Sequence, residues 1–162
     1  MTILARAAAL AAVLTLVSTM QAAAQSNTQS STIRVTIASG PHAGTYEMAE
    51  ECEQQSNGYP AVNIMAFTTG VQPPKTPHLM QFFLASAKGK PDGFVVSVQF
   101  HGKDGRYDIY AIPRELSPSA PLPSGKGTVT VKQTATGKTM SFRGQTKAGV
   151  KMEGTVVCRS GA

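Results

Sequence analysis

The chain has three histidines, and the one at position 101 has a candidate acidic partner. If Asp104-Gly105 forms a two-residue hairpin turn, His101 lies opposite Asp108 on the neighbouring strand. A histidine oriented by a carboxylate can act as a general base, so a secreted hydrolase using a His101–Asp108 pair is one alternative. A nucleophile is missing, because the chain has no Gly-x-Ser-x-Gly elbow and Ser97 lies roughly 13 Å from His101 along an extended strand. A solvent-facing ion pair explains the two residues more simply.

His78 and Met80 form a His-x-Met pair, whose imidazole and thioether groups suit copper. Exported copper carriers use such a pair together with a second His-Met element, but here Met48 follows Glu47. No histidine follows Cys158, as a blue-copper loop would require. Methionine at strand spacing usually fills a core, which also accounts for Met65, Met140 and Met152. A periplasmic copper-binding protein is therefore the second alternative.

Four acidic residues surround Cys52, namely Glu47, Glu50, Glu51 and Glu53. A calcium ion needs six to eight oxygen ligands, which such a cluster could supply in part. The segment lacks the Asp, Asn and Gly residues that punctuate calcium loops, so a solvated acidic turn is the better interpretation. We therefore expect no catalytic residue, no metal site and no cofactor.

The N-terminal residues have the plan of a cleavable secretory signal. One positive side chain, Arg6, precedes the charge-free apolar run Ala7–Val17, and the small residues Ala22-Ala23-Ala24 follow. The apolar run is too short to span a bilayer, which takes about 20 residues. We expect cleavage after Ala24, a disordered polar leader over residues 25–31, and a single domain over residues 32–160. The mature protein would be periplasmic or secreted, with no transmembrane segment.

The charge of the chain is positive and unevenly distributed. Its net charge is +6, and loss of Arg6 with the signal leaves +5. From Leu116 onward there are seven basic residues and a single acidic one, Glu153. This pattern fits a solvated basic sheet face, or a face that attracts an anionic partner such as an envelope component. The basic residues are not interleaved with aromatic ones, so a nucleic-acid groove is not indicated.

Two cysteines, Cys52 and Cys158, are the only ones in the chain. An even number in an exported protein favours a disulfide, and two free thiols are the alternative. A bridge across a loop of about 100 residues is worth on the order of 4–5 kcal/mol in the chain-entropy model.

Short runs rich in Val, Ile, Thr, Phe and Tyr alternate with turn signals along the whole mature chain. This spacing predicts an all-β protein, an antiparallel β-sandwich of about seven to nine strands with an immunoglobulin-like layout and one disulfide. Residues 33–37, 45–48, 62–67 and 78–85 are expected strands, with Ile33, Val35 and Ile37 pointing inward on the first of them. The last is expected to be buried on both sides, and a buried helical turn is the alternative there. The best helix candidate is residues 47–55, although it is short and a turn is the alternative.

Three hairpins can be tested by register, because inward side chains must share a face. A turn at Asp104-Gly105 pairs Phe100 with Ile109 and Val98 with Ala111. The other two turns predict the pairs Val131–Phe142 and Gln133–Met140 around Thr136-Gly137, and Gly144–Met152, Phe142–Gly154 and Met140–Val156 around Lys147-Ala148-Gly149. The last strand then points Cys158 into the core.

The order Gly44-x-Tyr46, a following cysteine, many short strands and a terminal Gly154-x-Val156-x-Cys158 resembles uncharacterised exported bacterial proteins of the small β-sandwich kind. Some cell-envelope lipoprotein antigens share the glycine-rich strands, but this chain lacks their lipid-anchor cysteine. The resemblance implies a layout and assigns no functional residue. The function we expect is that of a non-enzymatic, exported binding or envelope-associated module whose ligand the sequence does not identify.

Overall fold

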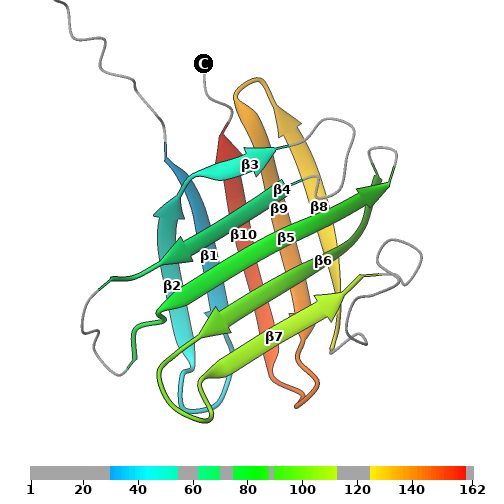
Figure 1. The fold of residues 1–162 in the computed structure, drawn as a ribbon. Coiled ribbons are helices and arrows are strands. Elements are labelled where there is room, and N and C mark those ends of the chain that lie inside the picture. Colours follow the sequence, from blue (N-terminus) through cyan, green and yellow to red (C-terminus); the bar gives the residue numbers. More distant parts are fainter. Residues whose placement is uncertain (1–29, 55–61, 70–74, 88–89, 113–124, 160–162) are drawn as a thin grey trace, which may run out of the picture.

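A computed structural model describes residues 30–54, 62–69, 75–87, 90–112 and 125–159. Within these ranges the chain forms ten β-strands and no helix, arranged as two five-stranded antiparallel sheets packed face to face (Figure 1). The all-β prediction is confirmed, and the number of strands exceeds the expected seven to nine. The expected signal peptide, residues 1–24, and most of the expected leader, residues 25–31, lie outside the described residues.

Sheet A has the strand order β2-β1-β10-β9-β8, and sheet B has the order β3-β4-β5-β6-β7. Their bounds are β1 Ser31–Ile37, β2 Gly44–Glu50, β3 Cys52–Gln54, β4 Val62–Phe67, β5 Leu79–Ala87, β6 Lys90–Gln99, β7 Arg106–Ala111, β8 Lys126–Thr134, β9 Gly137–Gln145 and β10 Lys151–Arg159. Neighbours in a sheet are neighbours in sequence, except that β1 pairs with β10. This is a meander, whereas an immunoglobulin layout would need Greek-key connections.

The candidate helix over residues 47–55 and its alternative, a turn, are both wrong, because the described part of this segment forms β2 and β3. The strand expected at residues 45–48 is part of β2. Pairing with β1 shows that the first part of this segment is an extended strand, because Met48 lies opposite Ile33 and Tyr46 lies opposite Val35. Both side chains pack against the core, while Glu47 between them is exposed. Glu51 separates the two strands, and there the chain passes from sheet A to sheet B.

The core lies between the two sheets and consists of the alternate, inward side chains of the strands. On β1 these are Ile33, Val35 and Ile37, as the sequence predicts. On β5, Met80, Phe82 and Leu84 are buried, whereas Leu79, Gln81 and Phe83 on the opposite face are half-buried, so most of this strand is not buried on both sides. The rings of Phe82, Phe94 and Phe142 pack together in the core, with centroids 5.8–6.3 Å apart.

The predicted registers are confirmed for one hairpin and wrong for two. The β9–β10 hairpin has the expected pairs, including Phe142 with Gly154, and Gly149 has the expected positive φ of 87°. In the other two, β6 pairs Val98 with Tyr107, four residues from the expected Ala111, and β8 pairs Val131 with Met140, two residues from the expected Phe142. A slip of two or four residues keeps every side chain on its face, so the apolar side chains expected to point inward still do so.

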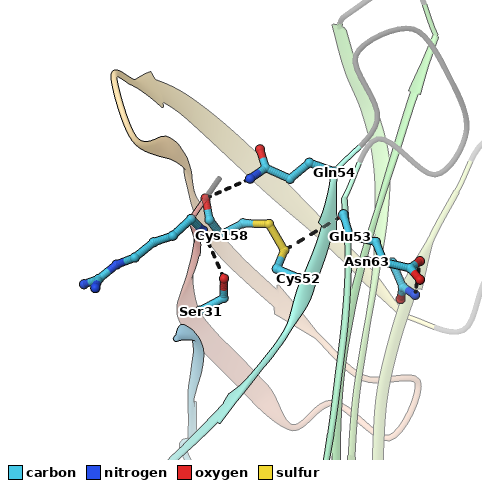
Figure 2. Close-up of a disulfide and its surroundings, with 7 residues drawn as sticks. Ser31, Cys52, Glu53, Gln54, Asn63 and Cys158 are labelled. Carbon is cyan, nitrogen blue, oxygen red and sulfur yellow. Dashed lines mark hydrogen bonds between the residues drawn. A yellow bond between two sulfur atoms is a disulfide. The ribbon is translucent and has the colours of Figure 1, made fainter. Parts of the chain in front are cut away.

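The disulfide between Cys52 and Cys158 is confirmed, and it joins the start of β3 in sheet B to the end of β10 in sheet A (Figure 2). Cys158 is fully buried, as its alternation predicts. Two hydrogen bonds flank the bridge: Gln54 Nε2 donates to the Cys158 carbonyl at 3.3 Å, and the Arg159 N–H donates to Ser31 Oγ at 3.0 Å. Ser31, assigned to the leader from sequence, is therefore a buried strand residue. None of the described residues belongs to a helix that is long and apolar enough to cross a membrane.

Candidate binding site

The outward side of sheet A, here called the basic face, gathers most of the basic residues of the C-terminal part of the chain. Strand register arranges them in rows that cross the sheet. In the first row, Gln145 of β9 lies between Lys126 of β8 and Lys151 of β10. Two strand spacings place the Cα atoms of these lysines about 10 Å apart.

The second and third rows add an arginine, a carboxylate and several hydroxyl groups. Arg143 of β9 lies between Thr128 and Glu153, and Glu153 in turn lies opposite Thr36 of β1. The third row contains Thr130, Ser141, Thr155, Arg34 and Glu47. Each row is about 7 Å from the next, since two residues separate them along a strand.

The basic face is hollow rather than flat. Two adjoining depressions of about 650 and 520 Å³ are both lined by Thr36, Thr128, Arg143 and Glu153. Glycines form part of the lining, and their missing side chains would have pointed into the core. A Cβ atom on Gly127 would lie 2.7 Å from Phe94 Cζ, and one on Gly144 would lie 2.8 Å from Ile109 Cδ1. The sheet therefore approaches the opposite layer closely at these positions, which leaves room on its outer side.

The positive charge of the hollow is only partly compensated. Ion pairs between described residues include Arg34–Glu47 at 3.7 Å and Arg106–Asp108, and neither of these involves Lys126, Arg143 or Lys151. Glu153 is the one carboxylate among the residues that line the depressions. Three cations and a single anion therefore line the depression of about 650 Å³, so its electrostatic potential favours an anionic ligand.

His101 and Asp108 do not face each other, so the predicted pairing is wrong. The β6–β7 hairpin has a longer loop than expected, closed by a hydrogen bond from the Phe100 N–H to the Gly105 carbonyl. Asp108 lies opposite Ser97, whose buried hydroxyl donates to Oδ1 at 2.7 Å. His101 lies in the loop and stacks on His78, with ring centroids 4.5 Å apart. The contact between Ser97 and Asp108 was missed because it depends on the length of this loop.

The candidate metal ligands are dispersed. Met80, Met140 and Met152 are buried in the core, and His78 is held in the stack with His101. Around Cys52, Glu47 faces Arg34 on sheet A, whereas Glu53 accepts a hydrogen bond from Asn63 on sheet B. In the described ranges no three His, Cys, Asp or Glu side chains converge as metal ligands.

The third histidine belongs to an aromatic cluster at one end of the sandwich. His42 stacks on Phe100 at 4.1 Å, and its Nδ1 lies 3.1 Å from the hydroxyl of Tyr107. Tyr46 donates its hydroxyl hydrogen to the His42 carbonyl at 2.9 Å. Burial, and secondarily the neighbouring Tyr107, raise the pKa of Tyr46 above its ordinary value. These contacts join the β1–β2 turn to the β6–β7 hairpin.

No protein-family model matches this chain, and neither a curated protein nor a solved structure matches it.

Proposed function

We propose that the protein is an exported, non-enzymatic binding module that holds an anionic envelope component against its basic face. The observation that carries this proposal is the hollow lined by Lys126, Arg143 and Lys151, whose charges have no ion-pair partner among the described residues. The disulfide between the two sheets suits an oxidising compartment outside the cytoplasm.

The arrangement supports binding more than catalysis. Arg143 can form two parallel hydrogen bonds with a carboxylate, sulfate or phosphate group, and the two lysines can contact further oxyanions. The surrounding threonine hydroxyls both donate and accept hydrogen bonds. On this face the depressions are lined by no histidine or cysteine that would serve as a general base or nucleophile.

The test is retention on immobilised heparin and on anionic liposomes as a function of salt. The mature wild-type protein should remain bound well above about 0.1 M salt, where isolated surface charges are already screened. The Arg143→Gln/Lys151→Gln variant should lose about tenfold to thirtyfold in affinity, at about 1 kcal/mol for each lost cation near an anionic surface.

The matched control is Lys75→Gln/Lys103→Gln, which removes the same charge at two exposed positions outside sheet A. The control should bind like the wild type if the hollow is the site. It should bind as weakly as Arg143→Gln/Lys151→Gln if only net charge matters. Elution of the wild-type protein at or below about 0.1 M salt would count against the proposal.

A further inference from the structure

We infer that the ligand is a linear anionic polysaccharide, one chain of which lies along β9 and β10 in the hollow of the basic face. This inference rests on the proposed function and names its ligand class. The shared chemistry is a repeated oxyanion, carboxylate or sulfate, on an extended hydroxyl-bearing chain.

The spacing of the cations favours a chain over a small anion. The Cα atoms of Lys126 and Lys151 are about 10 Å apart across the sheet, and Arg143 lies one row further along the strands. Side chains at these positions do not surround a single point. A chain that follows β9 from the first row to the third, over roughly 13 Å, passes all three cations, and Arg34 lies in the third row two strands away on β1.

The floor of the hollow favours a hydroxyl-rich ligand. Thr128, Thr130, Ser141 and Thr155 lie on it in neighbouring positions of three strands. Each hydroxyl can donate to an oxyanion or accept from a sugar hydroxyl. The aromatic side chains of the sheet A strands, Tyr46 and Phe142, point inward, so this face has no ring on which a neutral sugar could stack. Charge and hydrogen bonding must therefore select the ligand.

The shape of the face disfavours a membrane as the partner. A bilayer surface is flat on this scale and would touch the rim of the hollow without reaching the hydroxyl groups. Peripheral proteins that bind bilayers usually also insert apolar side chains. Among the described residues the one large hydrophobic side chain that is exposed is Phe67, at the end of β4 in the other sheet.

The experiment compares four probes by titration with the mature protein: polygalacturonate, heparin, neutral dextran and phosphatidylglycerol vesicles. Binding to either soluble polyanion, weakened by salt and absent for dextran, is the expected result. Polygalacturonate alone would identify carboxylate as the preferred oxyanion, heparin alone would identify sulfate, and both results support a chain in the hollow. A monomeric galacturonate should bind far more weakly than the polymer, because it spans a single row.

A variant that fills the hollow without changing the charge tests the location. Ser141→Tyr places a large side chain on the floor at an exposed strand position, and it should weaken chain binding by about tenfold or more. Ala49→Tyr is the control, on an exposed position of the same face in β2, outside both depressions. Circular dichroism and unfolding curves of both variants should match those of the wild type. Glu153→Gln should strengthen chain binding about twofold to fivefold, because it removes the opposing carboxylate.

The outcomes distinguish failure of the polysaccharide inference from failure of the proposed function. Binding to vesicles without binding to either soluble polyanion overturns the polysaccharide inference and leaves an anion-binding face in place. Equal affinity of wild type and Ser141→Tyr for the chain overturns the hollow as its site. Salt-insensitive or absent binding to all four probes overturns the proposed function itself.

Discussion

At the scale of single residues, the most informative contacts are those that tie the two sheets together at their ends. The Tyr46 hydroxyl donates to the carbonyl of His42, and both rings pack on Phe100 from the β6–β7 hairpin. Because burial raises the pKa of Tyr46, the folded protein holds the phenolic proton more tightly than the unfolded chain does. This contribution to stability is complete below the ordinary pKa of tyrosine, about 10, and is lost as the pH rises through the raised value.

Replacement of Tyr46 by phenylalanine should therefore change how stability depends on pH. At neutral pH Tyr46→Phe should cost about 0.5–1.5 kcal/mol, since it removes one hydrogen bond. As the pH rises above about 10, the wild type should lose stability faster than the variant, so the difference should narrow. Urea unfolding at neutral pH and at several pH values above this point measures both effects. A stability difference between wild type and Tyr46→Phe that stays constant over this pH range would contradict a raised pKa of Tyr46.

At the scale of elements, glycines in β8, β9 and β10 determine how closely sheet A approaches the core and its neighbours. Phe142 of β9 lies opposite Gly154 of β10, and its ring occupies the space that a side chain at 154 would need. A Cβ atom on Gly154 would lie 2.1 Å from the Arg34 carbonyl oxygen and 2.7 Å from Phe142 Cζ. Backbone atoms of β1 cannot move away cheaply, because β1 pairs with strands on both sides.

Gly154→Ala should consequently destabilise the protein by about 1–3 kcal/mol through overpacking, even though alanine is small. Ser141→Ala, at an exposed position of the adjacent strand, is the control and should stay within about 0.5 kcal/mol of the wild type. Urea or guanidinium midpoints of the three proteins provide the measurement. Equal midpoints for Gly154→Ala and wild type would show that the strands can separate without cost.

At the scale of the whole molecule, the two sheets are joined at one corner by both the chain and the disulfide. The chain passes from β2 to β3 through Glu51, and Cys52 immediately afterwards binds Cys158 of β10. The bridge closes a loop of 106 residues, which contains most of both sheets. A cross-link over so long a loop restricts the unfolded chain strongly.

Removal of the bridge should lower the free energy of unfolding by about 4–5 kcal/mol in the chain-entropy model. The comparison is between wild type, reduced wild type and Cys52→Ala/Cys158→Ala in the same denaturant series. Reduced wild type and the variant should unfold at similar, lower denaturant concentrations. Mass spectrometry of the exported protein should find no free thiol, and two free thiols in that product would refute the role of the bridge.

The sequence by itself determined the properties that depend on local pattern. Period-two alternation identified most of the strands and their inward faces, and the turn Lys147-Ala148-Gly149 predicted the register of β9 and β10. Alternation also placed Cys158 inside, and the count of cysteines predicted its bridge to Cys52. These features were accessible because they follow from side-chain direction along one strand and from glycine in a tight turn.

Only the tertiary structure decided the features that depend on distant neighbours. Pairing with β1 extended the strand expected at residues 45–48 to Glu50 in place of the candidate helix, and the real loop length separated His101 from Asp108. The sequence indicated a basic sheet face, but pairing of β1 with β10 brought Thr36 and Arg34 to it, and close packing over inward glycines made it hollow. Loop lengths and strand neighbours are selected by the summed packing of both sheets, which no local window of the chain contains.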